Sequence, residues 1–301
     1  RYTFPKSTTS RILFDIGHKQ GESATITDAE VTYHPETNEV TGWVENYPIY
    51  ATFCQPDGKI KIFFAAKLDK KPQTIGTFID EKIQENSNSV KGPGCGLYLT
   101  FQTKAKEQIQ MQVGLSYTNI ENARNNRDSE ATGKSFDDVK NAAHQTWNEM
   151  LSRIQVEGGT EDDKTVFYSS FYRTFERPIC MSEGGRYFSA FDGKVHEDNG
   201  TPFYTDDWIW DTYRAAHPLR TLIDQQKEED IIASYLRMAE QMGNMWMPTF
   251  PEVTGDTRRM NSNHAVATVA DALAKGLKVD TAKAYEACRK GIEEKTLAPW
   301  S

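Results

Sequence analysis

The sequence of 301 residues has few cysteines and no long apolar run. The cysteines form no Cys-x-x-Cys pair and show no zinc-like spacing with the six histidines, so we interpret them as ordinary packing residues. They are Cys54, Cys95, Cys180 and Cys288. No apolar run approaches the roughly 20 residues that a membrane-spanning helix needs. We therefore expect no membrane span.

Charge of one sign is not concentrated anywhere along the chain. The net charge of -8 comes from 43 acidic and 35 basic residues. Nucleic-acid binding normally requires a basic face, so we expect no nucleic-acid partner. With 38% hydrophobic and 11% aromatic residues, the chain can bury a sizeable core. Its length is compatible with two domains.

The first half of the chain has the period of two that is typical of β-strands. Segments 30–33 and 39–44 flank a turn-like stretch, as do 50–54 and 59–65, so both pairs read as hairpins. Segments 10–17, 96–102 and 108–117 read as further strands, the last with Ile109, Met111, Val113 and Leu115 on one face. Segments 86–94 and 119–133 read as a loop and a polar connector. These features predict an antiparallel β-sandwich.

At Ser135 the period changes to that of a helix. Ser135 and Asp138 resemble a capping box, and Thr160 precedes three acidic residues in the same way. Further helices are predicted over 228–242, 264–275 and 280–295, and Val166, Phe167, Phe171 and Phe175 are predicted to form a buried stripe. We predict a β-sandwich domain over 1–130, a linking helix over 131–158 and a helical domain over 159–301. Periodicity leaves a bundle and an (α/α)6 toroid both open.

The segment 203–218, Phe-Tyr-Thr-Asp-Asp-Trp-Ile-Trp-Asp-Thr-Tyr-Arg-Ala-Ala-His-Pro, predicts a helix capped by Thr205. Asp206 and Asp207 would then lie at the positive end of the helix dipole. Helical spacing places one set of polar and aromatic side chains on one side: Asp207, Trp210, Asp211, Arg214 and His217. The simpler interpretation is that Asp211 pairs with Arg214 and that Trp210 belongs to the core.

The connection 243–263 is too long and too aromatic for a simple link. Trp246 and Phe250 are candidates for an apolar platform under a sugar ring, and the alternative is that they cap the core below the loop. His264 begins the next helix, where a structural or capping role is the default interpretation.

Several segments together resemble glycoside hydrolase family 92. They are Tyr204-Thr-Asp with Trp210-Asp-Thr-Tyr-Arg-Ala-Ala-His-Pro-Leu219, Trp246-Met-Pro-Thr-Phe-Pro251, and Asn263-His-Ala-Val with Ala270-Asp-Ala272 and Lys275-Gly276. Arg186-Tyr-Phe, Phe191-Asp-Gly-Lys194, Val113-Gly-Leu-Ser-Tyr117 and Asn122-Ala-Arg-Asn125 fit the same pattern, so the resemblance runs through most of the chain.

The resemblance implies a calcium-dependent exo-α-mannosidase acting on mannose-terminated glycans. It implies a β-sandwich followed by an (α/α)6 barrel, with the active site between them, and export from a glycan-degrading bacterium to its periplasm, outer surface or surroundings. It also implies that one set of residues binds substrate: Trp210, Asp211, Arg214, Trp246, Asn263 and His264. The reaction implied is hydrolysis with inversion by two carboxyl groups, one acid and one base.

The family's acid, base and most calcium ligands lie in motifs that we do not find in these 301 residues. We therefore expect an internal piece of a longer protein, inactive by itself, with the C-terminal part of the sandwich and the first helices of the barrel. Asp206, Asp207 and Asp211 are too few for a tight calcium site, and none is expected here.

The matched part also departs from the family pattern. Asn263 stands where an aspartate is usual, Thr249 and Phe250 where Lys and Trp are frequent, and Asp207-Trp208 replaces a Phe-Ser-like pair. These changes alter the hydrogen bonds that the site can offer to a sugar, so the glycosidic linkage that is cleaved is left open. A glycan-binding protein without hydrolytic activity is the alternative function. An unrelated barrel enzyme, such as a polysaccharide phosphorylase or lyase, ranks last.

Overall fold

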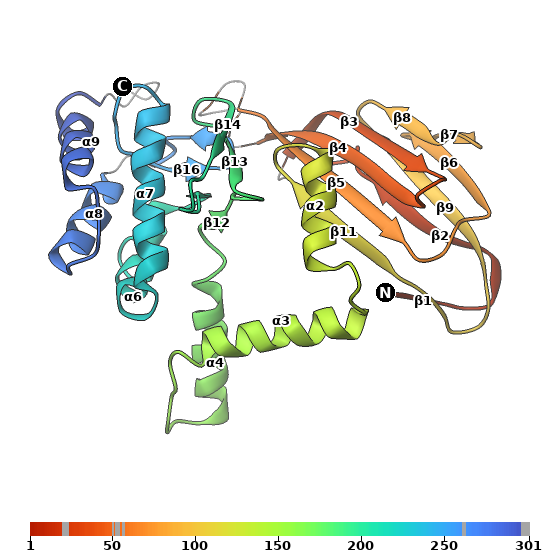
Figure 1. Cartoon of the computed structure of the whole chain (residues 1–301), viewed down its shortest axis with the longest axis horizontal. Helices are drawn as coiled ribbons and strands as arrows, with labels where there is room; N and C mark the ends of the chain where they lie inside the picture. Colours follow the sequence, from red (N-terminus) through yellow and green to blue (C-terminus); the bar gives the residue numbers. More distant parts are fainter. Residues whose placement is uncertain (20–23, 50, 52–54, 56–57, 261–262, 296–301) are drawn as a thin grey trace. The chain divides into compact units, whose positions relative to one another are not determined.

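The structure is a computed structural model of the whole chain, and it describes residues 1–301 except 20–23, 50, 52–54, 56–57, 261–262 and 296–301. The chain forms two compact units, Arg1–Asn141 and Ala142–Ser301 (Figure 1). The predicted strand over 50–54 lies largely outside the described residues.

The first unit consists mainly of antiparallel strands. They are β1 (Tyr2–Phe4), β2 (Ser7–Asp15), β3 (Ala24–His34), β4 (Glu39–Pro48), β5 (Ile60–Leu68), β6 (Thr74–Ile79), β7 (Lys82–Glu85), β8 (Ser89–Lys91), β9 (Cys95–Thr103), β10 (Glu107–Ile109) and β11 (Met111–Ser116). One sheet has the order β11-β5-β4-β3-β8 and the other β2-β9-β6-β7, while β1 pairs with β10. The predicted hairpin around residues 34–38 is confirmed, because His34 of β3 lies opposite Glu39 of β4.

A single apolar core joins the two sheets. Alternate residues of β2 and β9, such as Ile12 and Leu99, pack with residues of the other sheet, such as Val31 and Val40. Each of these four side chains is buried, as the period of two requires for strands with one inward face. The predicted β-sandwich is confirmed.

The predicted strand 108–117 is wrong in one respect, because it is two strands that join different partners. β10 pairs with β1 and β11 with β5. Val113 and Leu115, expected on one face with Ile109, are exposed, whereas Ile109 is buried. Gly114 is buried instead, and a Cβ atom there would lie 2.0 Å from the backbone oxygen of Ala123. The helix that covers this face needs the glycine for its close approach.

That helix is α2 (Ile120–Glu130), so the predicted polar connector is wrong. Its buried residues are only Ala123 and Arg127, too few to give an apolar stripe in the sequence. Arg127 forms a buried ion pair with Glu39 of β4, which also accepts from Arg124 Nε at 2.9 Å. The predicted loop 86–94 likewise contains β8, which pairs with β3.

The second unit is largely helical. Its elements, with α3 beginning in the first unit, are α3 (Phe136–Leu151), α4 (Glu161–Arg173), β12 (Ile179–Cys180), β13 (Arg186–Ser189), β14 (Lys194–Glu197), β15 (Tyr204–Thr205), α5 (Ile209–Thr212), α6 (Ala216–Ile223), α7 (Gln225–Gln241), β16 (Pro251–Glu252), β17 (Gly255–Asp256), α8 (His264–Ala274) and α9 (Thr281–Glu293). The helices predicted over 228–242, 264–275 and 280–295 are confirmed. In the described part of the chain, the helices do not close a barrel (Figure 1).

The predicted capping box at Ser135 and the predicted N-cap at Thr160 are both present. The Ser135 hydroxyl accepts from Asp138 N at 3.1 Å, and the Thr160 hydroxyl accepts from Asp163 N at 3.2 Å. The predicted buried stripe on α4 is wrong, because only Phe171 of that helix is buried and Val166 is exposed. α3 buries none of its residues. The aromatic residues spaced along these helices make ring contacts at the surface, such as Trp147 with Tyr172.

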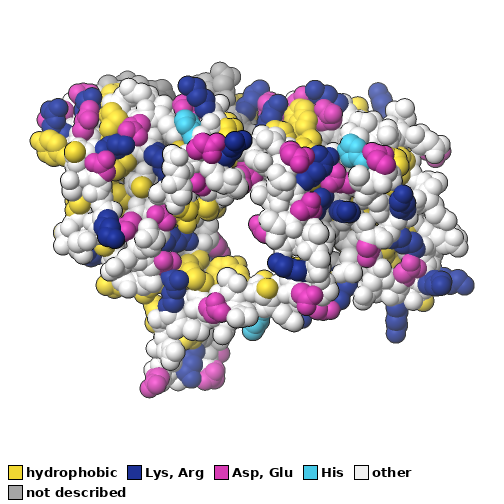
Figure 2. All heavy atoms as spheres, in the orientation of Figure 1, with side chains coloured by type: hydrophobic (Ala, Val, Ile, Leu, Met, Phe, Trp, Pro, Cys, Tyr) yellow, Lys and Arg dark blue, Asp and Glu magenta, His cyan; other side chains and the backbone are white. Residues whose placement is uncertain are grey.

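The buried centre of the second unit is α7, which packs on α6, α9 and β15. No described helix is long and apolar enough to cross a membrane. Cys95, Cys180 and Cys288 are free thiols, while Cys54 lies outside the described residues. Figure 2 shows Lys and Arg side chains interspersed with Asp and Glu over the visible face.

Candidate functional site: an exposed aromatic wall on a short helix

The short helix α5 carries the central motif, and it begins at Ile209 rather than at Thr205. Thr205 belongs to β15, and its buried hydroxyl donates to the backbone oxygen of Glu252 at 3.1 Å. Asp206 has a φ of 61°, a left-handed conformation that cannot continue into a helix. The predicted capped helix is therefore wrong.

The motif residues do not share one continuous helix face, because the chain leaves helical conformation between α5 and α6. Trp210, Asp211 and Arg214 are exposed, whereas Asp207 and His217 are fully buried. The motif thus splits into an outer group and an inner group.

The outer group gathers around three rings, Trp210, Tyr213 and His264, which we call the aromatic wall. The His264 ring stacks on Tyr213 with centroids 3.8 Å apart and lies 5.2 Å from the Trp210 ring. Arg214 Nε donates to the Tyr213 hydroxyl at 2.8 Å. Trp210 remains 44% exposed, so the interpretation of this indole as core is wrong.

Asp211 and Asn263 stand beside these rings. Among the residues that the structure describes, the Asp211 carboxylate has no hydrogen-bond or ion-pair partner, so it does not pair with Arg214. Asn263 is exposed and its side chain does not cap α8. Burial lowers the pKa of His264, and the Arg214 charge lowers it further. At neutral pH the His264 imidazole is therefore neutral.

Two other residues from the sequence lie elsewhere. Trp246 is half-buried, and its described ring contact is with Arg258, not with the aromatic wall. Phe250 is 2% exposed and packs on Trp208, so for this ring the core interpretation is correct. Thr249 is also buried and donates its N–H to Asp256 Oδ2 at 3.0 Å.

The inner group is a buried charged network under α5. His217 Nε2 lies 2.9 Å from Asp207 Oδ2, and its Nδ1 lies 2.8 Å from Glu228 Oε1. Tyr235 donates its hydroxyl to Asp207 Oδ2 at 2.5 Å, and Arg220 lies 4.0 Å from Glu228 Oε2. Each of these side chains is at most 5% exposed. Sequence spacing placed Asp207 and His217 together, but it did not reveal Glu228 or Tyr235 of α7.

The charges of this network fix its protonation. Burial alone would lower the pKa of His217, but Asp207 and Glu228 raise it to about 9. Burial alone would raise the pKa of Asp207, but His217, Arg220 and Tyr235 lower it to about 2. His217 is therefore an imidazolium that donates to a carboxylate from each ring nitrogen.

A second set of charges surrounds Trp208. Arg177 pairs with Asp206 and Arg259 with Glu252, and both guanidinium groups lie over the indole, at 3.9 and 5.6 Å from its centroid. Burial raises the pKa of Glu252 to about 7, against the opposing effect of Arg259. This carboxyl is 1% exposed and pairs with Arg259.

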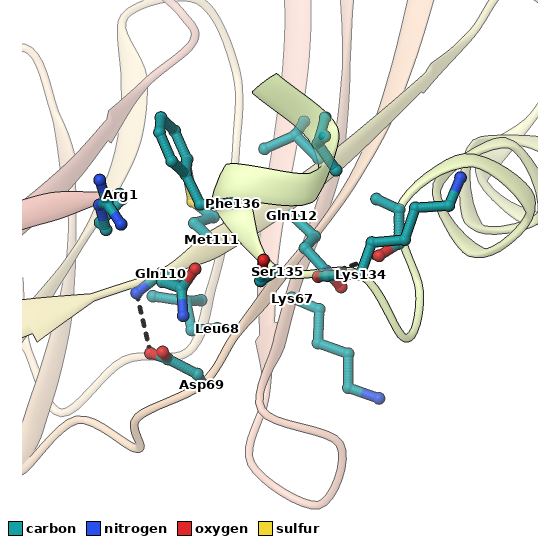
Figure 3. Close-up of a pocket in the computed structure, with 13 residues that line it drawn as sticks. Arg1, Lys67, Leu68, Asp69, Gln110, Met111, Gln112, Lys134, Ser135 and Phe136 are labelled. Atoms are coloured by element: carbon teal, nitrogen blue, oxygen red, sulfur yellow. Dashed lines mark hydrogen bonds between the residues drawn. The ribbon is translucent and has the colours of Figure 1, made fainter. Parts of the chain in front are cut away.

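A separate pocket of about 400 Å³ lies in the first unit (Figure 3). Several of its polar groups already have partners: Asp69 accepts from Gln110 N at 2.9 Å, Gln112 donates to Ala131 O, and Arg1 pairs with Asp137. It holds none of the predicted site residues. The aromatic wall is therefore the better candidate.

Comparison with known proteins identifies the chain. The model of the glycosyl hydrolase family 92 catalytic domain matches residues 122–300, and the model of the family's N-terminal domain matches residues 1–116. The chain belongs to glycosyl hydrolase family 92. The predicted family is confirmed. The N-terminal domain model covers the strands of the first unit, whereas most of α2 lies within the catalytic domain match.

Solved family 92 structures have the same fold. The α-mannosidase BT3965 from Bacteroides thetaiotaomicron in complex with mannoimidazole is 24% identical, with a TM-score of 0.86 over 97% of this chain and 38% of that chain. The inverting mannosidase BT2199 from the same species is 28% identical, with a TM-score of 0.83 over 94% of this chain and 37% of that chain. This family 92 chain thus spans about two-fifths of the length of these structures.

A curated relative is similar over a shorter stretch. It is an uncharacterized secreted glycosidase from Arthroderma benhamiae, 32% identical over 110 residues, which are 32% of this chain and 14% of that protein.

Proposed function

We propose that the full-length protein containing this chain is an exo-α-mannosidase that removes terminal α-linked mannose from glycans with inversion. The observation that carries the proposal is the exposed Trp210 ring in a family 92 chain, followed by the Asp211 carboxylate, which has no partner among the described residues. Two solved relatives in this family are named mannosidases.

The aromatic wall has the chemistry needed for a terminal sugar. The C–H face of a pyranose packs on an indole as other apolar groups do. The Asp211 carboxylate can accept hydrogen bonds from two sugar hydroxyls, and Arg214 offers donors next to it. The neutral His264 ring presents one donor and one acceptor. We assign Asn263 to the rim of this site, and Trp246 to a more distant position along the loop that precedes it.

The general acid and base belong, in this proposal, to a part of the protein outside this chain. Inverting hydrolysis requires two carboxyl groups about 6.5–9.5 Å apart that reach the glycosidic bond. Near the wall, Asp207 and Glu252 are buried and Asp206 is paired with Arg177. Asp211 alone cannot supply both functions.

Calcium dependence is part of the same proposal, but the residues present do not fit a calcium site by themselves. Calcium takes six to eight oxygen ligands. No group of three or more His, Cys, Asp or Glu side chains in the described residues is arranged to hold a metal ion. Most of the ligands would come from outside this chain, and no step is assigned to the metal here. Export of the protein is proposed on the resemblance and on the name of the secreted relative.

The test is mannose release from α-1,2-mannobiose by the full-length protein, with and without a calcium chelator, beside the 301-residue chain. We expect chelator-sensitive release by the full-length protein and none by the chain. Asp211→Asn should lower kcat/KM by about 10- to 100-fold, because charged hydrogen bonds to substrate are lost. Asp162→Asn, at an exposed carboxylate in the first turn of α4, is the matched control and should have no effect. Release that is indifferent to Asp211 would refute the assigned site.

The alternative is a glycan-binding protein without hydrolytic activity. Thr249, one of the two departures that suggested it, is buried in the structure. Only the exposed Asn263 still supports it. Glycan binding without release of mannose by the full-length protein would favour this function.

A further inference from the structure

The short helix that carries Trp210 and Asp211 lacks the usual means of stability. α5 has only four residues and no side-chain hydrogen bond at its N-cap. An isolated helix of this length does not persist in water. Ile209 anchors it by full burial and the Trp210 ring contacts His264 of α8, but these contacts are less directional than a hydrogen bond. A hydrogen bond to the interior supplies the directional constraint.

A hydrogen bond ties the last residue of α5 to the buried network. Thr212 Oγ1 donates to Asp207 Oδ1 at 2.7 Å, while the other carboxylate oxygen of Asp207 contacts His217 and Tyr235. The Thr212 hydroxyl also lies 3.2 Å from the backbone oxygen of Trp208. The carboxylate therefore connects the outer helix to the inner charges.

The inner charges are themselves fixed to two longer helices. His217 belongs to α6, and Glu228 and Tyr235 belong to α7. Arg220, also on α6, donates from Nη2 to the backbone oxygens of Thr174 and Arg177, at 3.1 and 2.5 Å. Two carboxylates and two cations balance in a site closed to water, so each is held by the others.

We propose that the buried imidazolium of His217, held between Asp207 and Glu228, is a positioning residue that orients Trp210 and Asp211 through the Asp207–Thr212 hydrogen bond. His217 does not touch substrate. The inference deepens the proposed function, since it concerns how the sugar-binding wall is kept in place.

The first test removes the Thr212–Asp207 hydrogen bond and leaves the charges of the buried network in place. In the full-length protein, Thr212→Val removes the hydroxyl but leaves every charged group in place, and we expect kcat/KM for α-1,2-mannobiose to fall about 5- to 10-fold, mainly through KM. Thr212→Ser keeps a hydroxyl and should restore activity. Thr221→Val is the control, since its buried hydroxyl bonds to Pro218 O within α6 rather than to Asp207.

The second test does not depend on catalysis. With 5-fluorotryptophan in the full-length protein, the Trp210 resonance, assigned through Trp210→Phe, should shift or broaden in Thr212→Val and not in Thr221→Val. Nitrogen NMR of His217 should show both ring nitrogens protonated at pH 8 in the unmodified protein and in Thr212→Val.

The outcomes distinguish the inference from the proposed function. An unchanged Trp210 resonance in Thr212→Val, or a neutral His217 at pH 8, overturns the positioning role even if mannose is released. A changed resonance with a charged His217 supports it even in a protein that binds glycans without cleaving them.

Discussion

Two histidines close to α5 lie in opposite environments. His264, in the exposed aromatic wall, has Arg214 nearby and no carboxylate partner among the described residues, and its pKa is lowered. His217, below the helix, lies between two carboxylates, and its pKa is raised to about 9. Burial disfavours the charged form of both rings, so the difference comes from the neighbouring charges. A neutral ring suits a surface that meets a sugar, whereas a charged ring suits an internal support.

The largest expected effect comes from removing the inner histidine. His217→Gln leaves two buried carboxylates without their shared cation, and we expect the free energy of unfolding of the full-length protein to fall by about 3–5 kcal/mol. His264→Gln, which breaks ring contacts in a partly exposed place, should cost about 1 kcal/mol or less. Urea unfolding of both variants measures the contrast. Equal losses would show that the two histidines do not differ as described.

The pH dependence of stability sharpens the same contrast. The pKa of His217 is about 9 in the folded protein and near 6.5 when unfolded, so its contribution is complete below about pH 6.5 and is lost as pH rises through 9. The loss should be about 3 kcal/mol. The pKa of Asp207, lowered to about 2, implies a second loss as pH falls from about 3.8 through 2.

Urea unfolding from pH 6 to 10 measures the alkaline loss, with His217→Gln as the reference. The variant should lack this component of the curve. The same slope in both proteins would mean that His217 is not charged in the folded state.

A smaller effect is expected at the outer surface. Trp210→Ala removes the exposed ring of the aromatic wall and should weaken binding of mannobiose by about 10-fold, through lost apolar contact, with little change in stability. Trp147→Ala, at another partly exposed ring on α3, is the control and should leave binding unchanged. Titration calorimetry of the two full-length variants measures their affinity for mannobiose. An equal loss of affinity in both would argue against a specific role for Trp210.

The smallest effect is electrostatic. Arg214→Gln removes the cation that helps to lower the pKa of His264, so this pKa should rise, although burial would keep it below 6.5. Proton NMR titration of the His264 ring follows the change. The pKa of His217 should not move, since Arg214 does not face the buried network. A fall in the pKa of His264 would contradict the assignment.

The sequence predicted those elements whose signals lie in a short stretch of the chain. Periodicity and end signals predicted the hairpin of β3 and β4, the N-terminal caps of α3 and α4, and helices α7, α8 and α9. α2 was missed because its attachment to the sheet depends on Arg127 and on the absent side chain of Gly114, which no apolar pattern reveals. Hydrophobic periodicity also misplaced Val113 and Leu115, since the covering helix decides which face is inward.

The sequence likewise predicted only part of the candidate site. Trp210, Asp211, Arg214 and His264 were predicted together from the resemblance, and the structure brings the rings of Trp210 and His264 into contact. Their roles in binding stay predictions. Tyr213, which stacks on His264, was overlooked although it lies within the motif. The left-handed Asp206 and the distant partners of His217 depend on tertiary contacts, which spacing along the chain does not encode.

The buried network also constrains how this protein can change over evolutionary time. A single substitution at Asp207, His217 or Glu228 leaves a buried charge without its partner. Replacing all three together with apolar residues of similar volume need not be destabilising. Descendants of this sequence therefore have few viable single steps at these positions. In a deep alignment of its nearest relatives, the three should be gained and lost as a group, while the outer residues of the proposed sugar site should vary independently of them.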